Sequence, residues 1–143
     1  MSESIQTESI QTETIHSNRL LTHPVAAVWA QLTDPERVSR WLMPTDLRAE
    51  VGASFTFDTG RWGKVSCQVL EVVPERLLRF SWRNGALDTV VSWRLEPEGE
   101  HTRLFIEHSG FDAQDPAQRF ALDGMRAGWS GAVVDRLVAE LGR

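Results

Sequence analysis

The order of hydrophobic and polar residues divides the chain into segments of different period. Between residues 46 and 109 the two classes alternate with a period of two, and turn-forming residues interrupt the alternation at short intervals. This pattern predicts β-strands with one buried and one exposed face. Because the breaks are short, consecutive strands are expected to pair antiparallel. The predicted strands span residues 46–51, 53–59, 64–73, 77–83, 87–96 and 101–109, and a further edge strand ends near Leu21.

Two short helices are predicted between the edge strand and the rest of the sheet. Apolar residues recur with helical spacing after Pro24. Proline suits the start of a helix, because the N–H that it lacks would have no partner within the helix at this position. A second helix is expected to begin after Thr33 or Asp34, since either side chain can cap it and Pro35 suits its first turn.

One long helix is predicted at the C-terminus. Asp115 is a suitable N-cap, Pro116 suits the first helical position, and apolar positions continue to Leu141. Each glycine within this segment should destabilise a helix by about 1 kcal/mol relative to alanine. Three glycines, Gly124, Gly128 and Gly131, fall on one face of this helix at i, i+4 and i+7. Either a backbone or a ligand approaches this face closely, or the helix bends there. The whole pattern predicts an α+β fold in which a strongly curved sheet surrounds this helix.

The length of 143 residues suits one domain. We expect residues 1–8 to be a disordered tail and residues 9–143 to form the domain. A pentapeptide, Ser-Ile-Gln-Thr-Glu, occurs at residues 4–8 and again at 9–13, but five residues is too short a period for a solenoid unit.

Charge and cysteine content exclude several classes of partner and site. The net charge is −5 and basic residues do not cluster, so nucleic acid is not expected as a partner. The first thirty residues lack a continuous apolar stretch, so we expect neither a secretory signal nor a membrane span, and the cytoplasm is the expected location. The single cysteine, Cys67, excludes an internal disulfide, and the four histidines are scattered, so no metal and no cofactor is predicted.

Four stretches of the sequence resemble a known family. They are "HPVAAVWAQLTDPERVSRWLMP", "LEVVPERLLRFSW", "TRLFIEHSGF" and "GWSGAVVDRL". They look like the homologues of the heat-shock-protein-90 ATPase activator, within the START-like (SRPBCC) superfamily, and the resemblance covers residues 19–141. It implies a helix-grip fold, in which a seven-stranded antiparallel sheet grips the C-terminal helix, often around an apolar cavity. Relatives include lipid and hormone binders, polyketide cyclases and aromatases, and a chaperone-activating domain.

The pair His108–Ser109 contains residue types that nucleophilic hydrolases use. Strand alternation places His108 on the same face as Leu104 and Ile106, whereas Ser109 points to the opposite face. The two side chains therefore cannot converge on one substrate atom, and no nucleophile-elbow motif surrounds the serine. An inward His108 is either a general acid or base, a polar anchor for a ligand, or a structural histidine hydrogen-bonded near the start of the helix.

Aromatic side chains are the most informative candidates for a binding site. Six tryptophans and six phenylalanines occur in a chain without tyrosine. They either line an apolar pocket or fill the core completely. Trp62, in a predicted hairpin loop, is a lid over the cavity, a contact for a protein partner, or a ring folded back on the sheet edge. The candidate ligand-binding residues are Trp41, Met43, Phe57, Trp62, Phe80, Trp82, Trp93, His108, Phe111, Met125 and Trp129.

Three functions remain open. The first is binding of a hydrophobic or aromatic small molecule between sheet and helix, without catalysis. The second is a cyclase-, aromatase- or hydrolase-type enzyme that uses the same cavity, with His108 as the only candidate catalytic residue. The third is a protein-binding module that regulates a chaperone, as the family resemblance implies. A homodimer through the edge strand is also compatible with the sequence.

Overall fold

A computed structural model describes residues 12–143 and confirms the α+β class. The proposed tail at residues 1–8 and the first copy of the pentapeptide lie outside the described residues. The elements in chain order are β1 (Thr12–Leu21), α2 (Val25–Thr33), α3 (Pro35–Trp41), β2 (Ser54–Asp58), β3 (Lys64–Val73), β4 (Leu77–Asn84), β5 (Leu87–Glu98), β6 (His101–Asp112), α4 (Pro116–Ser130) and α5 (Ala132–Leu141).

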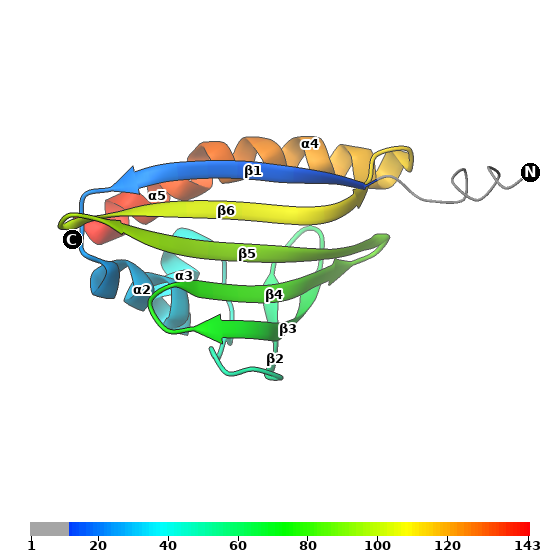
Figure 1. Cartoon of the computed structure of the whole chain (residues 1–143). Helices are drawn as coiled ribbons and strands as arrows, with labels where there is room; N and C mark the ends of the chain where they lie inside the picture. The colour runs from blue at the N-terminus through cyan, green and yellow to red at the C-terminus, as the bar shows by residue number, and fades with distance from the viewer. Residues whose placement is uncertain (1–11) are drawn as a thin grey trace, which may run out of the picture.

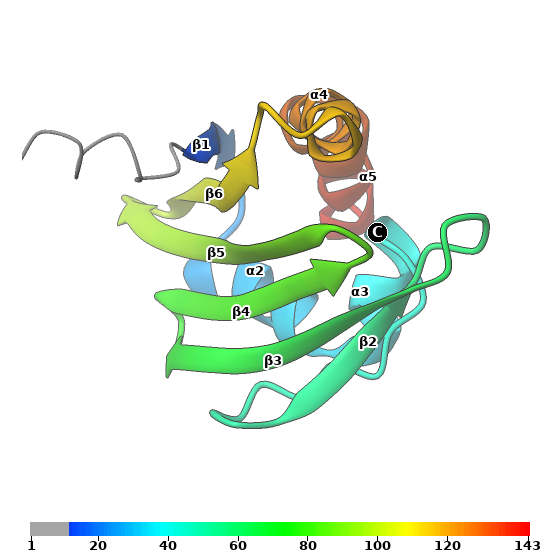
Figure 2. The ribbon, with the colours of Figure 1, turned by 90° about the vertical axis from the view of Figure 1, so that its right-hand side faces the viewer.

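One antiparallel sheet organises the fold. Its strand order is β1-β6-β5-β4-β3-β2, so the first strand pairs with the last and the others follow as a meander. Figure 2 shows that the sheet is strongly curved and that the helices lie on its concave side. Helix α4 runs along β1 and β6, whereas α5 packs against α2 and α3 (Figure 1). The arrangement is the predicted helix grip.

The sheet has six strands in the described part of the chain, not seven. The segment 46–51, predicted as a strand, is a loop, although Leu47 within it is buried. Thr45 and Asp46 explain the difference, because their side chains replace a partner strand beside β2. The Thr45 hydroxyl donates to the carbonyl of Thr56 at 2.7 Å, and the Asp46 carboxylate accepts the Thr56 N–H at 2.8 Å.

Strand β6 carries a bulge that changes which residues face the core. Glu13 of β1 pairs with Phe111 and Thr14 pairs with Ser109, so Gly110 is an extra residue with φ of 101°. The bulge shifts the alternation, and both His108 and Phe111 are fully buried. Phe111, which follows the predicted strand 101–109 and was a candidate ligand-binding residue, therefore lies in a strand and in the core.

The helix caps follow the sequence prediction, and the last helix is interrupted at one of the glycines where a bend was one of the alternatives. The carboxylate of Asp34 accepts the N–H of Glu36 at 3.0 Å, and that of Asp115 accepts the N–H of Ala117 at 3.0 Å. The predicted single helix from 116 to 141 is broken at Gly131 into α4 and α5. A Cβ atom at Gly131 would lie 3.2 Å from the carbonyl oxygen of Ala127, so the glycine permits this break.

Candidate functional site: a cavity between the sheet and helix α4

A cavity of about 1080 Å³ lies between α4 and the ends of two hairpins. One wall comes from α4 and the start of α5, and the other from β3, β4 and β5 with the β2–β3 and β4–β5 loops. The end of α3 closes the space between these walls. The lining residues are Leu42, Met43, Thr59, Trp62, Val65, Trp82, Asn84, Gly85, Ala86, Leu87, Ala117, Phe120, Ala121, Asp123, Gly124, Met125, Gly128, Trp129 and Val133.

Two exposed aromatic rings mark the mouth of the cavity. Trp62, at the tip of the β2–β3 hairpin, is 64% exposed, and Phe120 on α4 is 70% exposed. Their ring centroids lie 6.2 Å apart, so the rings meet across the opening. The side-chain amide of Asn84 donates to the carbonyl of Trp62 at 3.3 Å, which links the tips of the two hairpins. Trp62 therefore does not fold back on the sheet edge.

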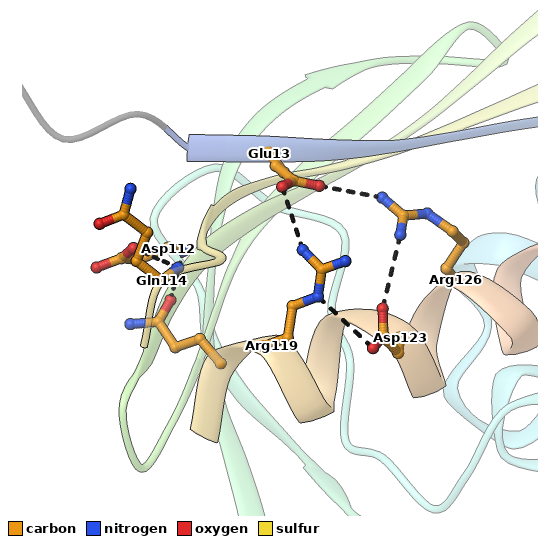
Figure 3. Close-up of polar contacts among 7 residues, drawn as sticks. Glu13, Asp112, Gln114, Arg119, Asp123 and Arg126 are labelled. Atoms are coloured by element: carbon orange, nitrogen blue, oxygen red, sulfur yellow. Dashed lines mark hydrogen bonds and ion pairs between the residues drawn. The ribbon is translucent and has the colours of Figure 1, made fainter. Parts of the chain in front are cut away.

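The lining of the cavity is mainly apolar. Its polar side chains are those of Thr59, Asn84 and Asp123. Asp123 already has partners, since its carboxylate lies 3.7 Å from Arg119 and 3.8 Å from Arg126. Both arginines also pair with Glu13 of β1, which closes a ring of four charges between β1 and α4 (Figure 3). The negative charge of Asp123 is thus compensated outside the cavity, and an uncharged ligand suits the lining.

Six of the predicted ligand-binding residues lie in the core and away from the lining. They pack against one another: Phe80 contacts Trp93 with ring centroids 5.0 Å apart, and Trp93 contacts Trp41 at 5.3 Å. In the part of the sheet that these rings cover, side chains fill the space. The six residues are Trp41, Phe57, Phe80, Trp93, His108 and Phe111, whereas Met43, Trp62, Trp82, Met125 and Trp129 line the cavity.

The sequence prediction identified Gly124 and Gly128 on one face of the helix but missed the two alanines that extend this row along α4. Ala117, Ala121, Gly124 and Gly128 all line the cavity and follow helical spacing. A Cβ atom at Gly124 would meet no other atom within 4 Å, so this glycine borders open space. The glycine face of the helix was the available signal, and extending it toward the N-terminus would have added both alanines. Phe120 carried no such signal, because an isolated aromatic residue on a helix usually packs into the core.

His108 lies in the core behind the cavity wall. Its side chain is 0% exposed, as strand alternation predicted. The indole Nε1 of Trp129 donates to Nδ1 at 3.1 Å, and Nε2 lies 2.8 Å from the hydroxyl of Thr89. Burial lowers the pKa of His108 from its usual 6.5 to about 3, because the charged imidazolium would lose its hydration.

This environment does not favour acid–base catalysis by His108. Both ring nitrogens have hydrogen-bond partners, and the residue is absent from the cavity lining. A general base must lie within hydrogen-bond reach of the proton that it removes, either directly or through one water. Ser109 points away from the inner face, so no Ser–His pair forms. Among residues 12–143 no group of three potential metal ligands occurs, and no helix in this range is long and apolar enough to cross a membrane.

Comparison with known proteins shows where this fold belongs. The profile of the activator of Hsp90 ATPase homolog 1-like proteins matches residues 22–142. The structure resembles that of protein MLL2253 from Mesorhizobium loti with a TM-score of 0.85 and 32% sequence identity, covering 92% of this chain and 98% of that chain. It also resembles CalU16 from Micromonospora echinospora, with a TM-score of 0.74, 25% identity and coverage of 92% and 86%.

A third similar structure is that of DynU16, a protein of the dynemicin biosynthetic locus. The TM-score is 0.76 and the identity 28%, covering 90% of this chain but 47% of DynU16, so the chain spans about half the length of that protein. A comparison with curated proteins finds no match. The family profile and the similarity to MLL2253 agree with the curved sheet, the helix that it grips and the four stretches of sequence noted above. The chain belongs to the activator of Hsp90 ATPase homolog 1-like family and has its START-like, helix-grip fold.

Proposed function

We propose that this protein binds an uncharged, largely apolar small molecule in the cavity beneath α4. The observation that supports the proposal is a space of about 1080 Å³ beside a core that is otherwise filled by aromatic side chains. Small-molecule sites usually have volumes of about 300–1000 Å³ and apolar walls with a few polar groups. The lining described above matches this composition.

The arrangement of the lining favours a ligand with an aromatic part. Trp82 and Trp129 form the inner wall, with ring centroids 6.4 Å apart and an edge-to-face arrangement, and Trp62 and Phe120 stand at the mouth. A planar ring between these side chains would gain aromatic contacts in addition to the burial of its apolar surface. The similarity to DynU16, from a biosynthetic locus, also supports a small-molecule ligand.

A neutral fluorescent probe, N-phenyl-1-naphthylamine, tests the proposal. Its fluorescence should rise on titration with the protein and saturate at one site per chain. Gly124→Leu should weaken this binding by about tenfold or more, corresponding to about 1.4 kcal/mol, because the new side chain occupies the open space beside Gly124.

Ala127→Leu is the matched control. Ala127 lies on the same helix, is exposed and does not line the cavity, so this variant should bind the probe as the wild type does. Absence of saturable binding to the wild type, or equal binding by Gly124→Leu, would reject the proposed site.

A second candidate function is contact with a protein partner, as in chaperone regulation. It is favoured by the exposed pair of Trp62 and Phe120, because large apolar side chains at the surface are characteristic of interaction sites. Addition of the protein to Hsp90 should then change the rate of ATP hydrolysis, and Trp62→Ala should abolish the change. An unchanged ATPase rate together with probe binding would reject the chaperone function and support the small-molecule function.

A further inference from the structure

His108 occupies the middle of a chain of hydrogen bonds that begins at the cavity wall. Trp129 Nε1 lies 3.1 Å from His108 Nδ1, and His108 Nε2 lies 2.8 Å from Thr89 Oγ1. The Thr89 hydroxyl in turn donates to the backbone carbonyl of Trp82 at 2.9 Å. The chain therefore connects α4 to β6, β5 and β4, and both of its ends belong to tryptophans that line the cavity.

The chemistry of the groups fixes the direction of this chain. An indole N–H is only a donor, so Nδ1 of His108 must be the acceptor and carries no proton. The proton of the neutral ring is then on Nε2, which donates to Thr89, and the Thr89 proton is directed to the Trp82 carbonyl. One tautomer of His108 satisfies every group in the chain.

Packing holds the imidazole of His108 in place. The His108 ring lies 4.7 Å from the ring of Phe111 and 5.4 Å from that of Trp82, measured between centroids. The backbone of Trp129 is held separately, because the Ser17 hydroxyl donates to its carbonyl at 3.0 Å. With the backbone fixed, the hydrogen bond to His108 determines which edge of the Trp129 ring faces inward.

We propose that His108 is the positioning residue of the ligand site, which fixes the Trp129 indole as a wall of the cavity by accepting its hydrogen bond. This inference rests on the proposed function. His108 does not itself line the cavity, so its effect on a ligand passes through Trp129. Without an acceptor, the buried indole N–H would lack a partner, so the ring orientation that forms the cavity wall would lose the free energy of this hydrogen bond.

Two substitutions separate positioning from simple packing. His108→Phe keeps a ring of similar size but removes the acceptor, whereas His108→Asn keeps a carbonyl oxygen that can accept from the indole. His108→Phe should weaken binding of N-phenyl-1-naphthylamine by about tenfold, equivalent to about 1.4 kcal/mol. His108→Asn should restore most of the affinity.

The indole N–H resonance of Trp129 supplies a direct spectroscopic signature. It can be assigned by its loss in Trp129→Phe. In the wild type this N–H should exchange slowly with solvent and should shift when the probe binds. In His108→Phe it should exchange rapidly, and in His108→Asn it should be protected again. A merely structural role of His108 would lower the stability of both variants. It would not produce a loss of probe affinity and of N–H protection in His108→Phe with recovery of both in His108→Asn.

The possible outcomes distinguish the two proposals. If the wild type binds no probe, the proposed function fails. If the wild type binds the probe and His108→Phe binds it equally well, only the positioning role of His108 is overturned. Should His108→Phe not fold, the wild type decides: rapid exchange of the Trp129 N–H, or a resonance that saturating probe does not move, overturns the inference.

Discussion

Lowering the pH from about 6 to about 4.5 is expected to reduce the free energy of unfolding through His108. In the folded protein burial lowers the pKa of this imidazole from 6.5 to about 3. The unfolded chain therefore binds a proton on His108 as the pH falls below about 6.5, whereas the folded chain stays neutral until about pH 3. Between these values the unfolded state holds one more proton, so stability falls as the pH falls.

The expected loss follows from that difference of one proton. It amounts to about 1.4 kcal/mol per pH unit, or about 2 kcal/mol between pH 6 and pH 4.5. A domain of this size is usually stable by about 5–15 kcal/mol, so the change is easily measured. Above about pH 6.5 both states carry a neutral imidazole, and His108 contributes no pH dependence there.

Urea denaturation at several pH values, followed by tryptophan fluorescence, measures this effect. Carboxylates also titrate in this range, so the informative quantity is the difference between the wild type and His108→Asn, which does not titrate at this position. The variant should lose about 2 kcal/mol less than the wild type over the same interval. His101→Asn is the matched control, because His101 is exposed. This variant should lose as much free energy of unfolding between about pH 6 and pH 4.5 as the wild type does. Equal pH dependence of wild type and His108→Asn would refute a buried neutral imidazole.

Three further predictions concern stability. Gly124→Ala should raise the free energy of unfolding by about 0.5–1 kcal/mol in urea denaturation, because a Cβ there meets no atom within 4 Å and alanine favours the helix. Gly110→Ala should lower it by about 1–3 kcal/mol, since φ is 101° and the new Cβ would lie 3.3 Å from the carbonyl oxygen of Asp88. Glu13→Gln should cost less than about 1 kcal/mol, and high salt should remove the difference, because its ion pairs with α4 are solvent-accessible. Glu107→Gln is the comparison for the last variant in thermal unfolding, because the carboxylate of Glu107 lies 3.9 Å from His16 of β1 and has no ion pair with α4 in the described part of the chain.

Local signals in the sequence correctly predicted most of the elements. Alternation placed Leu104, Ile106 and His108 on the inner face of one strand, because successive side chains in a strand point to opposite sides. Asp34 and Asp115 marked helix starts because a short carboxylate can accept a nearby backbone N–H. These relations involve residues only a few positions apart.

The errors occurred where a distant partner decides the outcome. Residues 46–51 have the alternation of a strand, but the side chains of Thr45 and Asp46 occupy the hydrogen-bonding groups of Thr56. For the last helix the sequence left a bend at the glycines open, and the packing of α5 on α2 and α3 accompanies a break at Gly131. The bulge at Gly110 depends on pairing with β1.

The sequence by itself determined the class of fold, the inward faces of the strands and the glycine face of the last helix, because a period of two or 3.6 is a local property of the chain. Only the tertiary structure decided which inward aromatic residues form a solid core and which border a cavity. Trp82 and Trp93 both face inward from adjacent strands, but Trp82 lies opposite the small residues of α4, whereas Trp93 packs against Trp41 and Phe80. Whether space remains in front of a ring depends on the side chain opposite, which is far away in the sequence.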